Sequence, residues 1–97
     1  MRKKYVLREN AQEAIKDIGR YTLKNHGKAQ RNKYLLGLNA RFESLADMPL
    51  KGRARPEVKA GYYSYDYEKH TIFYLIHDAH IEIIGVVHES SIPQRYL

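Results

Sequence analysis

The residue pair best suited to acid–base chemistry is His88 followed by Glu89. An imidazole with a neighbouring carboxylate can act as a general base, because histidine exchanges its proton near neutral pH. His88 also closes the apolar run "IEIIGVVH", so the alternative is a histidine that simply meets solvent at the end of a strand. The sequence favours the second interpretation.

The five histidines do not have the spacing of a metal site. A structural zinc site takes four ligands in paired short spacings, commonly with cysteine, and this chain has no cysteine. His77 and His80 flank a predicted turn, whereas His26 and His70 lie on separate predicted elements. We therefore predict no metal site and no other cofactor. The absence of cysteine also removes disulfides and thiol nucleophiles, and it fits a reducing compartment.

Tyrosines crowd the stretch "GYYSYDYEKHTIFYLI", with five of them within thirteen residues. In a strand, Tyr63, Tyr65 and Tyr67 share one face. Such a stripe can cover part of a sheet, dock another protein, or stack nucleic-acid bases. Base-stacking surfaces usually interleave Arg or Lys with the rings, whereas Ser64 and Asp66 separate these three. The pattern therefore favours sheet cover and protein docking over base stacking.

Positive charge is concentrated in the first third of the chain. The net charge is +6, and residues 1–33 hold ten Lys/Arg against three Asp/Glu, whereas residues 62–97 hold two against five. A basic face attracts nucleic acid, a ribosome or an acidic protein, or is only a solvated helix surface, and charge alone does not choose among these. A loop predicted at residues 50–61 adds four cations: Lys51, Arg53, Arg55 and Lys59.

Two helices are predicted after a short strand at "KKYVLR". Asn10 and Glu13 have the spacing of a capping box, so the first helix is expected to span about 10–26. Gly27 is a good terminator because glycine tolerates a left-handed conformation.

The second helix should run over 28–47 and end before Met48-Pro49. Its apolar stripe should face Ile15, Ile18 and the inward side of "IEIIGVV" in an antiparallel helical hairpin. The stripe consists of Leu35, Leu38, Phe42 and Leu45.

Three predicted strands, at 62–67, 71–77 and 81–87, are separated by short polar turns, so we expect an antiparallel meander. The third run is the most apolar of the three and should lie in the centre of the sheet. The predicted fold class is α+β: a short N-terminal strand and a helical hairpin packed on a small antiparallel sheet, forming one domain over 1–97. No run approaches the ~20 apolar residues of a membrane span, and "MRKKYVLREN" lacks the apolar core of a signal peptide. We therefore expect a cytoplasmic protein with no membrane contact.

Five segments at the joints of this plan resemble the ParE branch of the ParE/RelE toxin superfamily: "NHGKAQ", "LADMPLKGR", "AGYYSY", "KHTIFYLI" and "IEIIGVVHESSIPQRYL". The resemblance covers nearly the whole chain. It implies the toxin of a bacterial type II toxin–antitoxin pair, silenced by a cognate antitoxin. The ParE branch is associated with poisoning DNA gyrase, as in plasmid stabilisation, and the RelE branch with cutting mRNA on the ribosome.

Two positions help to choose between the branches. RelE-type ribonucleases usually carry arginines where this chain has Tyr63 and His88. Metal-independent cleavage of RNA needs a base, an acid and cations that stabilise the phosphorane, so we predict a toxin that binds gyrase without chemistry. The alternative is a RelE-like ribosome-dependent ribonuclease, with His88, Glu89 and the loop cations at its site. A degenerate toxin kept only as a partner or regulator is a third possibility. ParE endings often read His, two residues, Met-Asp, whereas this chain has Ser91-Ile92 at that place. The role of the C-terminal tail therefore stays open.

Under the leading hypothesis, residue type and position suggest contacts with two partners. Alanine at Tyr63, Tyr65 and Tyr67 together is expected to weaken antitoxin binding while the fold stays intact. Oligomers are expected to form mainly through the antitoxin. The antitoxin contacts are Tyr63, Tyr65 and Tyr67, and the target contacts are Arg53, Arg55, Pro93, Arg95 and Tyr96.

Overall fold

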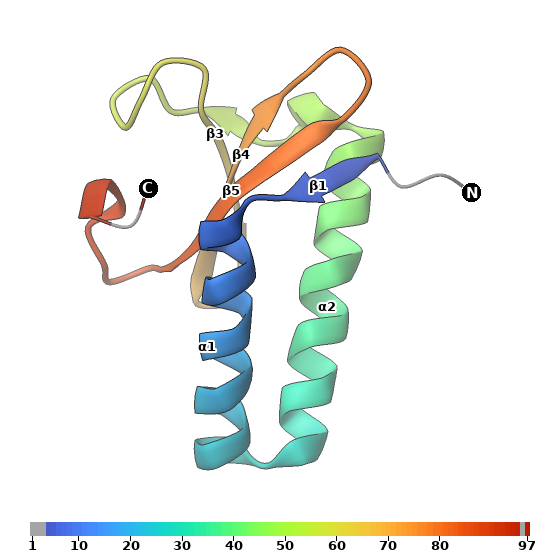
Figure 1. Ribbon diagram of the computed structural model, residues 1–97, viewed down its shortest axis with the longest axis vertical. Coiled ribbons are helices and arrows are strands. Elements are labelled where there is room, and N and C mark those ends of the chain that lie inside the picture. Colours follow the sequence, from blue (N-terminus) through green and yellow to red (C-terminus); the bar gives the residue numbers. More distant parts are fainter. Residues whose placement is uncertain (1–3, 96) are drawn as a thin grey trace.

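The computed structural model describes residues 4–95 and 97, which form two long helices and a five-stranded sheet (Figure 1). In chain order the elements are β1 (Tyr5–Leu7), α1 (Glu9–His26), α2 (Lys28–Asp47), the 3₁₀ turn η1 (Pro49–Lys51), β2 (Arg53–Ala54), β3 (Tyr63–Tyr67), β4 (His70–Ile76), β5 (Ile81–His88) and the 3₁₀ turn η2 (Pro93–Arg95). The predicted helices and the three predicted strands are confirmed to within about one residue at each end. No helix in the described part of the chain is long and apolar enough to cross a membrane.

Helix α1 begins one residue before the predicted start, and the capping box was a wrong prediction. Arg8 is the N-cap residue and makes no side-chain capping bond. The sheet fixes this start, because the Arg8 N–H donates to the Ile83 carbonyl at 3.0 Å and the Gln12 N–H then donates to the Arg8 carbonyl at 3.0 Å. Gly27 does end the helix as predicted, with φ of +91° and its N–H on the Leu23 carbonyl.

The sheet is mostly antiparallel, and its strand order is β1-β5-β4-β3-β2. Strands β2 to β5 pair antiparallel, but β1 lies parallel to β5, with Tyr5 opposite Ile81. The predicted antiparallel meander of β3, β4 and β5 is confirmed, and the predicted N-terminal strand joins its edge in parallel, a pairing that the sequence did not specify. Central β5 carries hydrogen-bonding groups on both sides, and β1 satisfies the side away from β4. Strand β2 was also missed, because its two residues lie inside the predicted basic loop.

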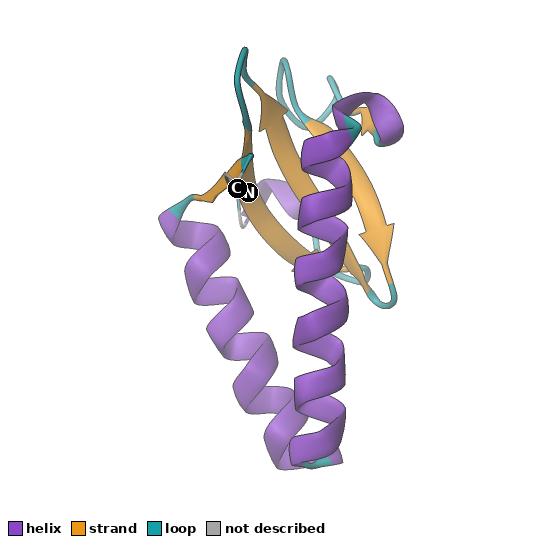
Figure 2. Cartoon of the chain, turned by 90° about the vertical axis from the view of Figure 1, so that its right-hand side faces the viewer, coloured by secondary structure: helices purple, strands orange, loops and turns teal. Residues whose placement is uncertain are grey.

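The main core lies between the helical hairpin and one face of the sheet (Figure 2). Three members of the predicted stripe are fully buried, whereas Leu35 and Ile15 are partly buried at its margin. A β-bulge at Phe73/Tyr74 shifts the register against β5. The buried members of this cluster are Tyr5, Ala11, Ile18, Leu38, Phe42, Leu45, Ile72, Tyr74, Ile81, Ile83 and Val86.

A smaller apolar cluster occupies the opposite face of the sheet, which we call the outer face. It consists of Tyr62, Phe73, Ile84 and Val87. Neither long helix covers this face; the loop residue Val58, Leu75 and the chain end at Leu97 pack against it. Strand β5 is thus covered on both faces, as its nearly all-apolar sequence predicted.

Buried Tyr74 holds the connection between α2 and the sheet. Its hydroxyl donates to the Pro49 carbonyl at 2.6 Å and accepts from the Gly52 N–H at 3.1 Å. A Cβ at Gly52 would meet both this hydroxyl and the Ser64 carbonyl, so only glycine allows the close approach. Tyr74 therefore sets where β2 begins and where Arg53 projects.

Candidate functional site

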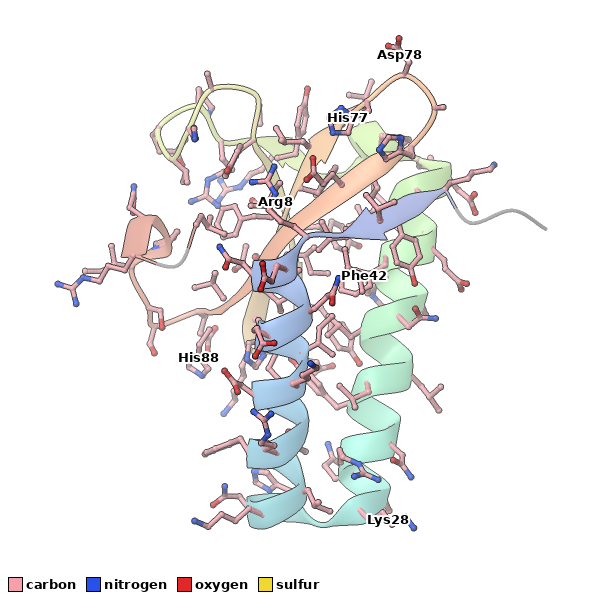
Figure 3. The ribbon with its side chains drawn as sticks, viewed as in Figure 1. Arg8, Lys28, Phe42, His77, Asp78 and His88 are labelled. Carbon is pink, nitrogen blue, oxygen red and sulfur yellow. The ribbon has the colours of Figure 1, made fainter. Side chains whose placement is uncertain are left out.

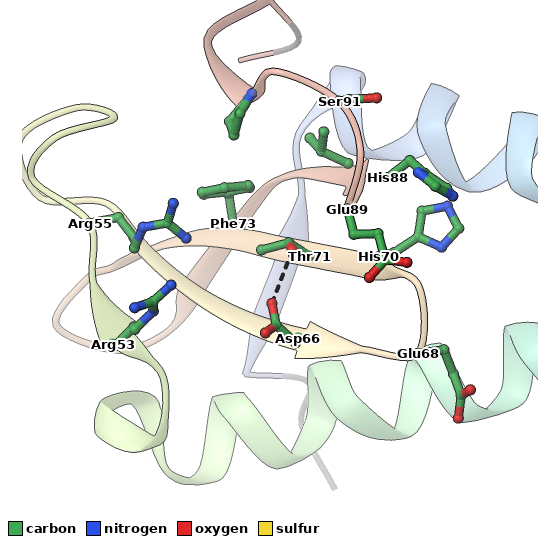
Figure 4. A pocket seen from close by; sticks show the side chains of 12 residues that line it. Arg53, Arg55, Asp66, Glu68, His70, Thr71, Phe73, His88, Glu89 and Ser91 are labelled. Carbon is green, nitrogen blue, oxygen red and sulfur yellow. Dashed lines mark hydrogen bonds between the residues drawn. The ribbon is translucent and has the colours of Figure 1, made fainter.

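A shallow cavity of about 340 Å³ lies on the outer face of the sheet beside the C-terminal segment. Arg53 and Arg55 lie at one end of it and His70 and His88 at the other (Figure 4). The Thr71 hydroxyl donates to the Asp66 carboxylate at 3.0 Å between these ends. The polar pair of Thr71 and Asp66 therefore separates the two guanidinium groups from the two imidazoles.

Arg55 is held in place, whereas Arg53 is exposed. The Arg55 Nη1 donates to the buried Ser64 hydroxyl at 2.9 Å, and its Nε pairs with the Glu57 carboxylate at 2.5 Å. The Arg55 guanidinium also lies 5.4 Å from the centroid of the Phe73 ring. Arg53 forms no ion pair with any residue in the described ranges. Of the two, Arg53 is the cation whose charge is available to a partner.

His88 is positioned by Ser90 and not by Glu89. Its Nδ1 lies 2.8 Å from the Ser90 hydroxyl and accepts the Ser90 backbone N–H at 3.1 Å. Because Nδ1 accepts from a backbone amide, the proton of the neutral ring belongs on Nε2. Glu89 lines the same cavity, but its hydrogen bond runs through the backbone, from its N–H to the Lys69 carbonyl at 2.8 Å. The expected poising of His88 by Glu89 is therefore not the observed arrangement.

His70 is a functional candidate that sequence reasoning missed. Its Nδ1 lies 2.6 Å from the Tyr34 hydroxyl, and its ring meets the His88 ring edge-on at 5.3 Å. Burial lowers the pKa of His70, and the neighbouring His88 lowers it further, whereas Glu89 opposes the shift. Burial raises the pKa of Tyr34 to about 12. The short turn at 77–80 was the available signal, because it pairs β4 with β5 and brings His70 opposite His88.

The tyrosine stripe of β3 faces the helices. Tyr63, Tyr65 and Tyr67 are half-buried and pack against the main core. The Tyr63 ring stacks on Tyr74 at 5.8 Å, and the Arg41 guanidinium lies 4.9 Å above the Tyr67 ring. Sheet cover is thus the role that these contacts show. They contradict the expectation that three alanines would leave the fold intact, because the substitutions would remove apolar contacts from the core.

The C-terminal residues assigned to target binding do not share one site. Pro93 lines the cavity with the two arginines, whereas exposed Arg95 lines a separate hollow of about 380 Å³ against the first turns of α1. Tyr96 lies outside the described residues. Leu97 packs on the outer-face cluster. The structure therefore groups Arg53, Arg55, Pro93, His88 and Glu89, and leaves Arg95 apart.

The charges of the cavity suit polar recognition better than phosphoryl chemistry. Three carboxylates, from Asp66, Glu68 and Glu89, line it together with the two arginines. These carboxylates repel a phosphodiester that approaches the histidines. Within residues 4–95 and 97, no group of three or more His, Cys, Asp or Glu side chains is arranged to hold a metal ion.

Solved structures show the same fold. A chain described as "Chromosomal ParDE TA system from P. aeruginosa" superposes with a TM-score of 0.75 at 12% identity, covering 89% of this chain and 95% of that one. A chain of a heterotetrameric YoeB-YefM toxin–antitoxin complex from Staphylococcus aureus gives a TM-score of 0.62 at 22% identity, covering 91% and 98%. Identities this low establish the fold alone.

The sequence comparisons establish the family. The chain is 30% identical over 95 residues to Toxin ParE1 of Caulobacter vibrioides, covering 98% of both chains. It is also 30% identical over 98 residues to Toxin ParE1 of Mycobacterium tuberculosis, over the full length of both. Residues 5–93 match the family described as ParE toxin of type II toxin-antitoxin system, parDE. The chain belongs to the ParE family of type II toxin–antitoxin toxins.

Proposed function

We propose that this ParE-type toxin acts by binding, without chemistry of its own, that its target is DNA gyrase, and that a cognate acidic antitoxin neutralises it. The observation that carries the proposal is the charge of the outer-face cavity, whose lining includes carboxylates from three segments beside the two arginines. A ribonuclease would need cations around the scissile phosphate. The carboxylates Asp66, Glu68 and Glu89 instead favour the docking of a polar protein surface.

Arg53 and Arg95 are the target contacts that can be tested cleanly. Both side chains are exposed, so glutamine should leave the fold unchanged, whereas replacing Arg55 also removes its bonds to Ser64 and Glu57. The double variant Arg53→Gln/Arg95→Gln should lose toxicity while its melting temperature stays that of the parent. The charge-matched control is Lys4→Gln/Lys59→Gln.

The target itself is tested with purified components. The protein should inhibit supercoiling by DNA gyrase or trap cleaved plasmid, and its induction in bacteria should trigger the SOS response before translation falls. The arginine variant should be defective in both assays and the lysine control active. Translation that stops first, with gyrase unaffected, would refute the gyrase assignment.

A RelE-like ribonuclease is the second candidate, favoured by one observation: His70 and His88 meet at 5.3 Å in the cavity that also holds the two arginines. A catalytic His88 would lose a factor of ~10² to 10⁴ in rate on substitution by glutamine, which cannot titrate. We expect His88→Gln to remain fully toxic. Cleavage of ribosome-bound mRNA by the parent, abolished in His88→Gln, would promote the ribonuclease.

The antitoxin assignment rests on charge and on the toxin–antitoxin complexes that share this fold. A small acidic antitoxin would be drawn to the basic helices and would reach the exposed edges of the β3 rings. Since those rings also cover the core, the test uses phenylalanine at 63, 65 and 67, which keeps the packing and removes only the hydroxyls. Antitoxin affinity should fall with unchanged stability; unaltered affinity would remove these tyrosines from the interface. Oligomers are expected to form mainly when the antitoxin is added.

A further inference from the structure

The tip of the helical hairpin carries a cluster of cations with no acidic residue among them. Residues 24–33 contain three lysines and one arginine and no Asp or Glu, and all of residues 23–30 are exposed. The tip projects beyond the sheet, with Lys28 at its extremity (Figures 1–3). Asp17, further back on α1, is already paired with Arg20 at 2.6 Å. The tip cations, which are Lys24, Lys28, Arg31 and Lys33, form no ion pair with any residue that the structure describes.

A cavity of about 350 Å³ lies directly beside this tip and is walled by aromatic rings. The end of α1, the start of α2 and the β3–β4 turn form it. Tyr21 is 64% exposed, and its ring meets that of His26 edge-on at 6.3 Å. The half-buried rings of Tyr34 and Tyr67 lie 5.1 Å apart and form the inner wall. The cavity thus offers one exposed ring, that of Tyr21, and two rings held by packing, those of Tyr34 and Tyr67.

Cations and rings alternate here, which is the arrangement that the β3 stripe lacks. Lys33 from α2 and Lys69 from the turn line the cavity, and neither is paired with a described residue. Glu68 is the one carboxylate among the cavity's described lining residues; it sits on the turn with φ of +54°, a backbone conformation uncommon outside glycine. Alternating cations and aromatic rings are what single-stranded nucleic-acid sites use for the backbone and the bases.

We propose that the hairpin tip binds single-stranded nucleic acid, with Lys28 and Lys33 on its phosphates and one base in the cavity of Tyr21, His26, Tyr34 and Tyr67. An acidic protein segment would also be attracted by the cations. It would leave the exposed Tyr21 ring without the flat π-face that a base supplies, so a polynucleotide fits the surface better. This is a direct toxin–polynucleotide contact at a cavity that shares only Glu68 with the outer-face cavity among the described lining residues. It is independent of which enzyme the toxin inhibits, but it uses Tyr67 and the basic helices, so the antitoxin proposed above would compete with the polynucleotide.

The phosphate contacts are tested by salt dependence. Binding of fluorescein-labelled dT20 and U20 to the full chain is followed by anisotropy between 50 and 200 mM salt. Each phosphate contact adds about 0.7 to the slope of log affinity against log salt for a single strand. Lys28→Gln/Lys33→Gln should therefore lower the slope by roughly 1.4. Lys4→Gln/Lys59→Gln removes the same charge away from the tip and should leave the slope unchanged. Comparison of the affinities for dT20 and U20 identifies DNA or RNA as the preferred ligand.

The base contact is tested at Tyr21, whose exposure makes Tyr21→Leu harmless to the core. This variant should bind dT20 about five-fold more weakly or worse, with its salt slope intact, and should bind an abasic 20-mer as the parent does. Equal slopes for the tip and control variants would overturn the proposal. So would an abasic strand that binds as tightly as dT20, since no base would then occupy the cavity. Poly-glutamate that competes equally would also overturn it, since the tip would then be a site for acidic protein. Gyrase is absent from these assays, so their failure leaves the target proposal untouched.

Discussion

Replacing Tyr74 by phenylalanine should loosen the segment that presents the arginines while the apolar core stays filled. Tyr74 is fully buried, and its hydroxyl joins Pro49 and Gly52 through two hydrogen bonds of 2.6 and 3.1 Å. Each such bond contributes about 0.5–1.5 kcal/mol net, so the loss should be about 1–3 kcal/mol. Burial raises the pKa of Tyr74, so the phenol remains a donor throughout the neutral range.

Urea denaturation measures this loss as a lower midpoint at unchanged slope, and a thermal melt should fall by roughly 4–8 °C for each kcal/mol. Amide exchange at Gly52 should accelerate more than exchange in β5, because Gly52 loses its acceptor. The matched control is Tyr65→Phe, whose hydroxyl has no protein partner within the described residues. If Tyr74→Phe unfolds at the midpoint of that control, the two hydrogen bonds do not anchor η1 and β2.

Three further predictions concern packing and pH. Phe42 is 2% exposed and contacts the Tyr5 ring at 5.5 Å, so Phe42→Ala should cost about 3–5 kcal/mol in urea denaturation, and a loss below about 1 kcal/mol would contradict the core described above. A Cβ at Gly37 would overlap the Tyr67 phenol, so Gly37→Ala should destabilise the parent but stabilise a Tyr67→Leu background by about 0.5–1 kcal/mol, and a double-mutant cycle without coupling would refute the contact. The lowered pKa of His70 means that the folded state binds its proton less readily than the unfolded state, so stability should be full above pH ~6.5 and decline as pH falls below it, and the decline should shrink in His70→Gln.

Local patterns predicted the elements, whereas long-range pairing decided what the sequence left open. The apolar spacing of α2 and the nearly all-apolar run of β5 both reflect burial, and both predictions were confirmed. The capping box failed because the Arg8 backbone is bonded to Ile83, 75 residues away, which fixes the helix start before any side chain can. The parallel pairing of β1 depends on the same distant strand. A two-residue strand such as β2 has no periodicity to detect.

The candidate site was predicted in part for a related reason. Arg53, Arg55, Pro93 and His88 were singled out by residue type, and the fold does bring them to one cavity. His70 was missed because its importance comes from its contacts with Tyr34 and His88, on two other elements. The alternation that placed three tyrosines on one face of β3 was correct, but it could not say that this face meets the helices.

The tail shows why stability must be measured beside every toxicity result. Leu97 packs on the outer-face cluster, so a truncation after Ile92 removes Arg95 and also uncovers apolar side chains of the sheet. Arg55 has the same double character, because its guanidinium covers Phe73 of that cluster while its charge lines the cavity. Loss of toxicity in either variant is therefore ambiguous between a lost contact and a weakened fold. Arg95→Gln in the full chain keeps Leu97 in place and changes only an exposed charge. If it is inactive with an unaltered melting temperature, the tail acts through Arg95. If only the truncation is inactive and it also melts lower than the parent, the tail acts by covering the sheet.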